Sequence, residues 1–173
     1  FGIHITHKED LEKAAELINS NGGDWGYVTF VIREDNRDIK QWQEMFDRMR
    51  ELHLVPIVRI ATKMESGHWK RPLKEDAIDW VRFLNSLNWV VKNRYVVIFN
   101  EPNHAKEWGG SIDPVNFAEV SRVFAEALKD GHPDYFILPA ALDLAADNNG
   151  GTLAAPRFFD EVYKKDPEFF TLF

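Results

Sequence analysis

An amide and a carboxylate stand at the end of an apolar run near the middle of the chain. Residues 96–99 read Val-Val-Ile-Phe, and Asn100, Glu101 and Pro102 follow directly. A short run of β-branched and aromatic side chains predicts a strand that is buried on both faces, as in a parallel sheet covered by helices. Proline has no N–H to donate to a sheet, so the strand must end by Pro102. Asn100 and Glu101 are therefore predicted at the carboxyl end of a sheet, where α/β proteins place their chemistry.

A carboxylic acid in such a position can exchange a proton with a bound molecule. Glycoside hydrolysis uses this chemistry, because it needs one carboxyl group to protonate the leaving oxygen and a second to act on the other face of the sugar. The alternative is that Asn100 and Glu101 form a polar strand end that only caps a loop.

The segment from Ile98 to Asn103 resembles the fourth-strand motif of clan A glycoside hydrolases, which are (β/α)8 barrels. The tripeptide Asn-Glu-Pro is short and therefore not specific on its own. The match is more significant because the tripeptide follows the fourth predicted strand, where the family has it. The resemblance implies that Glu101 is the acid/base of a retaining mechanism and that Asn100 hydrogen-bonds the sugar 2-hydroxyl. It also implies a nucleophilic Glu on a seventh strand, which no residue of this chain matches.

Predicted strands alternate with predicted helices along the whole chain. The strands lie at 1–5, 27–32, 54–61, 95–99 and 136–142, and the helical stripes at 11–18, 39–52, 77–87, 117–128 and 156–165. This alternation indicates βαβ units and a parallel sheet. Asp113 before Pro114 is typical of a helix N-cap followed by a first-turn proline. Residues 169–173 are predicted to begin a sixth strand.

A complete (β/α)8 barrel needs about 250 residues, and the chain has 173. The sequence therefore predicts an α/β fold, a TIM-type (β/α)8 barrel truncated after about five βα units, with residues 1–173 as a single domain. An open doubly wound sheet also fits the length. Against it, no glycine-rich phosphate loop follows the first strand.

Two arginines close predicted strands next to the motif. Arg33 ends the second strand and Arg59 lies near the end of the third. The resemblance implies an arginine at this rim that orients the nucleophile or a sugar hydroxyl, and by that analogy Arg33 is preferred. A structural ion pair is the alternative for each. His4 alternates with Ile3 and Ile5 on the first strand; it could face the barrel interior near the cleft, but a hydrogen-bonded core histidine is the favoured interpretation.

Further candidate substrate-binding residues lie in the loops at the same end of the sheet. Asn103 and His104 follow the motif directly, and Trp69 and Trp108 are loop tryptophans. Tryptophan suits stacking on the apolar face of a sugar, although each ring could also pack beneath its own loop. Asp143 ends the fifth strand and is the strongest candidate for a second carboxylate in this chain, but a loop anchor is the favoured interpretation.

Composition narrows the function classes. Asp and Glu number 28 against 21 Lys and Arg, giving a net charge of -7 without a basic stripe, which argues against nucleic acid as a partner. The sequence has no run long enough to span a membrane. Cysteine is absent, so disulfides and thiolate metal sites are excluded. No metal-ligand spacing occurs, and we expect neither a catalytic metal nor a cofactor.

The sequence leaves the cellular location of the protein open, with a slight preference for an extracytoplasmic one.

The resemblance thus implies a glycosidase, a retaining β-glycosidase of polysaccharides or oligosaccharides whose nucleophile lies outside this segment. The segment alone is expected to be inactive, and its oligomeric state is left open. One alternative is a non-catalytic carbohydrate-binding or scaffold module derived from a barrel. Another is a different α/β enzyme in which the motif matches by chance. The residues that follow Phe173 would discriminate between the first two.

Overall fold

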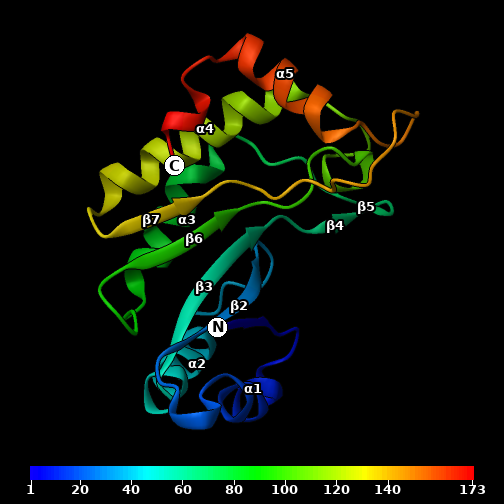
Figure 1. Ribbon diagram of the computed structural model, residues 1–173. Helices are drawn as coiled ribbons and strands as arrows, with labels where there is room; N and C mark the ends of the chain where they lie inside the picture. Colours follow the sequence, from blue (N-terminus) through cyan, green and yellow to red (C-terminus); the bar gives the residue numbers. More distant parts are fainter.

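Five parallel strands form the central sheet of the computed structural model, which describes residues 1–173 (Figure 1). They are β1 (Gly2–His4), β2 (Gly26–Arg33), β3 (Leu54–Ala61), β6 (Arg94–Ile98) and β7 (Tyr135–Leu138), and they lie in that order across the sheet. Each strand is therefore placed beside the one before it, and the order never reverses. A doubly wound sheet would reverse direction at a switch point, so the arrangement is that of a partial barrel.

The first four helices connect these strands and cover one face of the sheet, and the fifth follows the last strand and packs against the fourth. The helices are α1 (Leu11–Ile18), α2 (Ile39–Glu51), α3 (Asp76–Ser86), α4 (Pro114–Gly131) and α5 (Ala155–Lys165). A small hairpin, β4 (Met64–Glu65) with β5 (His68–Trp69), stands in the loop after β3. The predicted cap of α4 is confirmed, because the Asp113 side chain accepts a 2.9 Å hydrogen bond from the Asn116 backbone N–H.

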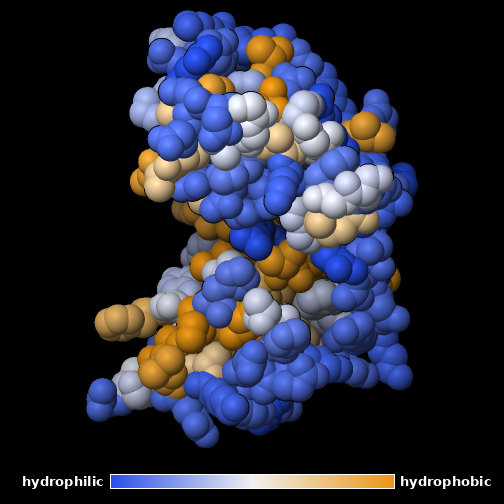
Figure 2. Space-filling model, turned by 90° about the vertical axis from the view of Figure 1, so that its right-hand side faces the viewer, coloured by the Kyte–Doolittle hydropathy of each residue, from blue (hydrophilic) through white to orange (hydrophobic).

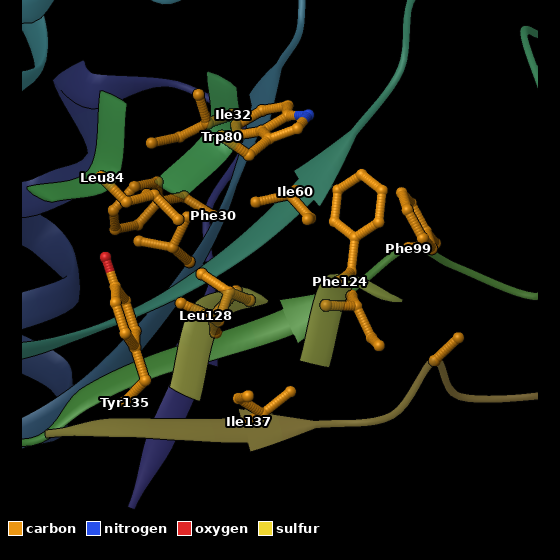
Figure 3. Packing of buried hydrophobic residues seen from close by; sticks show 14 of the residues in the cluster. Phe30, Ile32, Ile60, Trp80, Leu84, Phe99, Phe124, Leu128, Tyr135 and Ile137 are labelled. Atoms are coloured by element: carbon orange, nitrogen blue, oxygen red, sulfur yellow. The ribbon is translucent and has the colours of Figure 1, made fainter. Parts of the chain in front are cut away.

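The core lies between the sheet and its helices, as the alternation of side chains along β2 shows. Val28, Phe30 and Ile32 are at most 3% exposed, since every second side chain of a strand points to the same face. Aromatic and aliphatic side chains from the helices meet this face, among them Trp80, Leu84, Phe124 and Leu128 (Figure 3). Phe46 of α2 belongs to the same core.

The opposite face of the sheet carries no helix and stays open. Tyr27 is 38% exposed and Phe136 is 52% exposed. Tyr95 lies between them, with ring centroids 5.7 Å from Tyr27 and 5.3 Å from Phe136. In a closed barrel this face would point inward, so the molecule exposes aromatic side chains that such a fold normally buries.

Two predicted strand segments differ from the structure. Residues 169–173 do not begin a sixth strand, because Phe169–Thr171 form the 3-10 turn η4 and the Phe169 ring packs 5.7 Å from that of Phe117. The fifth strand, predicted to reach residue 142, ends at Leu138. The reason is Pro139, which lacks the N–H that would continue the ladder. None of the helices is long and apolar enough to cross a membrane.

Candidate active site

The backbone turns sharply where β6 ends. Phe99 and Glu101 both have positive φ angles, 69° and 35°, which are uncommon for residues other than glycine. Backbone hydrogen bonds hold this turn, from Phe99 N–H to the Ile60 carbonyl at 3.3 Å and from Glu101 N–H to the Ala141 carbonyl at 2.9 Å. Such strained residues persist only where their surroundings fix them, and they cluster at functional sites. The turn places Asn100 and Glu101 at the carboxyl edge of the sheet.

The Asn100 side chain is held from both sides. Arg59 donates from Nη1 to its carbonyl oxygen Oδ1 at 2.7 Å. Its amide nitrogen Nδ2 donates to Oε2 of Glu107 at 3.2 Å. A guanidinium can only donate and a carboxylate can only accept, so the two contacts select one orientation of the amide.

Arg59 reaches the site because β3 pairs with β6, with Arg59 opposite Val97 in the register. Its Nε atom is buried and has no hydrogen-bond partner. Burial lowers the pKa of the Arg59 side chain, while the charges of Glu107 and Glu101 oppose that effect. The guanidinium thus stands beside two carboxylates and keeps donor capacity for a further acceptor.

Glu107, which the sequence reasoning did not single out, completes this group. It lies on the 3-10 turn η3 (Ala105–Glu107) and is the only acidic residue between Pro102 and Ile112. Burial raises the pKa of the Glu107 carboxyl, and the nearby Glu101 charge adds to this, while the Asn100 hydrogen bond lowers it. Its position as the lone acid beside the motif is the signal that could have identified it.

A cleft of about 790 Å³ opens beside these residues. Arg59, Asn100 and Glu107 line it together with His4 and Trp69, among others. Glu101 is partly exposed and is not among the lining residues. The view onto the loops that follow the strands shows apolar surface in the hollow between the upper and lower halves of the molecule, flanked by hydrophilic side chains (Figure 2).

His4 is not the core histidine that the sequence predicted. Its side chain is exposed and lines the cleft, because His4 pairs in register with Thr29 and shares the uncovered face of the sheet. Partial burial, and then the positive charge of Arg59, lower the pKa of the His4 imidazole.

Of the two candidate arginines, the structure brings Arg59 to Asn100. Arg33 lines the cleft but pairs with Asp35, with its Nε 2.9 Å from Oδ1. It stands opposite Ala61 in the register, two residues further along the strand than the level of Arg59. The preference for Arg33 by analogy therefore does not match the observed contact.

Two predicted sugar contacts lie in the interior instead. Trp108 is 0% exposed; its ring packs against Phe99 and Phe117, and its Nε1 donates to Oδ1 of Asn116 at 3.1 Å. Asn103 is also 0% exposed. Neither side chain has exposed surface for a sugar in this structure, so the Trp108 ring adopts the alternative of packing beneath its own loop, although it also borders the cleft. Trp69 remains partly exposed at the cleft.

His104 and Asp143 form a pair beside the motif. His104 Nε2 lies 2.9 Å from Oδ2 of Asp143. The other carboxylate oxygen of Asp143 accepts from the Ala145 backbone N–H at 2.8 Å. These contacts, the backbone one first, lower the pKa of the Asp143 carboxyl. Asp143 thus anchors its loop, the interpretation that the sequence favoured.

The residues present do not form a metal site, since no three His, Cys, Asp or Glu side chains cluster in a way that could hold an ion. What the arrangement can do chemically is proton exchange and hydrogen bonding. The Glu107 carboxyl group, the oriented Asn100 amide and the partly free Arg59 guanidinium face a cleft wide enough for a small organic ligand. The Glu101 carboxyl group stands at the strand end beside them.

No protein-family model matches the chain, and no curated protein matches it in sequence. Solved structures do match. A monomeric β-xylosidase from Caulobacter crescentus CB15 is similar with a TM-score of 0.68 and 15% identity, over 95% of this chain and 39% of that one. The catalytic domain of a mannanase from Streptomyces sp. SirexAA-E has a TM-score of 0.58 and 18% identity, over 97% of this chain and 52% of that one. The chain thus spans about half or less of these structures, and its fold of βα units matches part of their TIM-barrel domains.

Proposed function

We propose that this chain is the acid/base half of a retaining glycoside hydrolase, with Glu101 as the general acid/base. The observation that carries the proposal is the strand end itself. Asn100 and Glu101 leave the carboxyl edge of the sheet through a strained turn, and the Asn100 amide is oriented beside a cleft. The similarity of the fold to part of two glycosidases supports it.

In this proposal Glu101 protonates the glycosidic oxygen as the bond to the leaving group breaks, and later removes a proton from the attacking water. Asn100 has unused hydrogen-bonding capacity, because its amide can make four hydrogen bonds and two are made to Arg59 and Glu107. A sugar hydroxyl can both donate and accept, so it can form the hydrogen bonds that the Asn100 amide has left unmade.

The nucleophile is proposed to come from outside residues 1–173. A retaining site places its second carboxyl group about 5–5.5 Å from the acid, on the other face of the sugar. Asp143 already accepts from His104 and the Ala145 backbone, and Glu107 holds Asn100 from the same loop as Glu101. Neither is placed as an opposing nucleophile.

We further propose a β-linked sugar as the substrate, and β-xylosides and β-mannosides are the first to test. The two similar structures are a β-xylosidase and a mannanase. The partly exposed Trp69 ring at the cleft suits stacking on a sugar face.

The test uses Glu101→Gln in a polypeptide that joins residues 1–173 to the units that complete the barrel. The substitution keeps the shape but removes the transferable proton. With a poor leaving group, kcat/KM should fall by about 10²–10⁴-fold, whereas an activated aryl β-glycoside should lose little in the glycosylation step. Glu101→Ala should respond to added azide, which needs no general base to attack a glycosyl-enzyme.

Glu16→Gln provides the matched control, because Glu16 is exposed and lies on α1, away from the strand end. It should leave both rates unchanged. Equal losses with both classes of leaving group in Glu101→Gln would contradict the acid role. Sugar binding without any turnover by the completed barrel would refute the enzyme and favour the carbohydrate-binding module instead.

A further inference from the structure

We propose that Glu107 is a positioning residue, whose carboxylate holds the Asn100 amide in the orientation in which that amide meets a sugar hydroxyl. The inference rests on the proposed function, because it gives Asn100 a sugar contact. It adds a residue that lies outside the strand-end motif and that acts through Asn100.

The geometry makes Glu107 one half of a clamp. An asparagine amide can present either its oxygen or its nitrogen in a given direction, and rotation by 180° exchanges the two. Arg59 offers only donors and therefore takes Oδ1, at 2.7 Å. Glu107 offers an acceptor and takes Nδ2, at 3.2 Å. If either contact is lost, the other alone must hold the amide against rotation.

The Glu107 carboxylate makes no other hydrogen bond or ion pair that would explain its position. The hydrogen bond from Asn100 is the one that the Glu107 side chain accepts from the protein, and no basic side chain forms an ion pair with it within 4.0 Å. The turn beneath it is packed against the core, because the next residue, Trp108, is fully buried against Phe99 and Phe117. Glu107 also lines the cleft, so its side chain belongs to the candidate site.

Protonation should loosen the clamp, because a neutral carboxyl accepts more weakly than a carboxylate. The charged and titratable groups that act on Glu107 are Glu101 and His104 from its own loop and Arg59 from β3. Burial, followed by the Glu101 charge, raises the pKa of Glu107 above its ordinary value of 4.5. The amide should therefore lose its fixed orientation at a higher pH than an exposed glutamate would allow.

The first test is a double-mutant cycle on kcat/KM in the completed barrel. Glu107→Ala should lower kcat/KM about tenfold, as expected for one hydrogen bond to a charged group. Glu107→Gln keeps a carbonyl acceptor and should recover most of that loss, and it should shift the acidic limb of the pH profile downward. In the Asn100→Ala background, Glu107→Ala should cost nothing more. Lys106→Ala, an exposed change on the same turn, should have no effect.

The second test needs no turnover. The side-chain amide signals of Asn100 in a ¹H–¹⁵N spectrum of residues 1–173, assigned by their loss in Asn100→Ala, should titrate with a midpoint above 4.5. In Glu107→Gln they should not titrate with that midpoint. Two results would refute the role of Glu107 even if Glu101 proves catalytic. One is that the Asn100 amide signals of the unsubstituted protein do not change with pH. The other is that the losses of kcat/KM caused by Glu107→Ala and Asn100→Ala are additive. Absence of turnover by the completed barrel would instead refute the proposed function, while the spectrum still decides whether Glu107 holds Asn100.

Discussion

Replacing Asn103 by Ala should lower the stability of the fold, and it should not remove a direct contact with a bound sugar. Asn103 follows the motif directly, yet its side chain is fully buried and bonds only to the backbone of the loop beyond β7. Nδ2 donates to the Asp143 and Leu153 carbonyls, each at 3.0 Å, and Oδ1 accepts from the Asp143 N–H at 3.2 Å. The substitution removes all three hydrogen bonds and leaves their backbone partners unpaired.

Each hydrogen bond contributes about 0.5–1.5 kcal/mol net, so the free energy of unfolding should fall by about 3 kcal/mol. That is a large part of a total stability of about 5–15 kcal/mol, and it corresponds to a Tm lower by about 6–12 °C for a chain of this size. Urea unfolding followed by circular dichroism measures the change, provided that the slope with urea stays constant.

Asn88→Ala is the matched control, because Asn88 is exposed and its side chain forms no hydrogen bond in the structure. It should change stability by less than about 0.5 kcal/mol. An Asn103→Ala protein as stable as this control, with weakened binding of oligosaccharides, would refute the assignment of Asn103 as a loop anchor and restore it as a cleft ligand.

Three further predictions follow from the packing and charges. Trp108→Ala should cost about 3–5 kcal/mol in the same urea assay, as for other large core side chains, and a loss below about 1 kcal/mol would contradict its full burial. Hydrogen bonds from Lys165 and Lys74 lower the pKa of Glu119 to about 2, so its carboxylate should stabilise the fold above pH 4.5 and lose that effect as the pH falls from 4.5 to about 2. Glu119→Gln should remove this part of the pH dependence of unfolding, and an unchanged dependence would count against the two contacts. We expect residues 1–173 to self-associate in light scattering and Phe136→Lys to reduce that association, because Phe136 is exposed on the uncovered sheet face at an unpaired edge strand. A monomer, or association that the substitution leaves unchanged, would contradict this role of the edge.

The sequence by itself determined the succession of βα units and the place of the motif. Apolar runs such as 96–99 and the helical stripes between them depend on local periodicity, which is visible without any tertiary contact. The same local chemistry identified Asp113 as the cap of α4. The end of β7 at Leu138 was missed, because the strand was predicted to reach residue 142 although Pro139 lacks the N–H that would continue the ladder.

The tertiary structure decided which side chains meet. Arg33 and Arg59 both lie near strand ends on the same face, and only the order of the strands decides between them. Arg59 lies on β3, which pairs with β6, whereas Arg33 lies on β2, one strand further from Asn100. Glu107 reaches Asn100 because the loop after the motif folds back as a short turn. Hydropathy gives no sign of such contacts between residues from different segments.

Burial of the two loop tryptophans was decided in the same way. Trp69 and Trp108 are alike in type and setting in the sequence, and both border the cleft, yet Trp69 is partly exposed whereas Trp108 is 0% exposed beneath its loop. The difference arises from Phe99 and Phe117, which enclose the Trp108 ring from a strand end and from α4. Exposure depends on what the rest of the chain packs against a side chain, and a residue's own neighbours in sequence do not fix that.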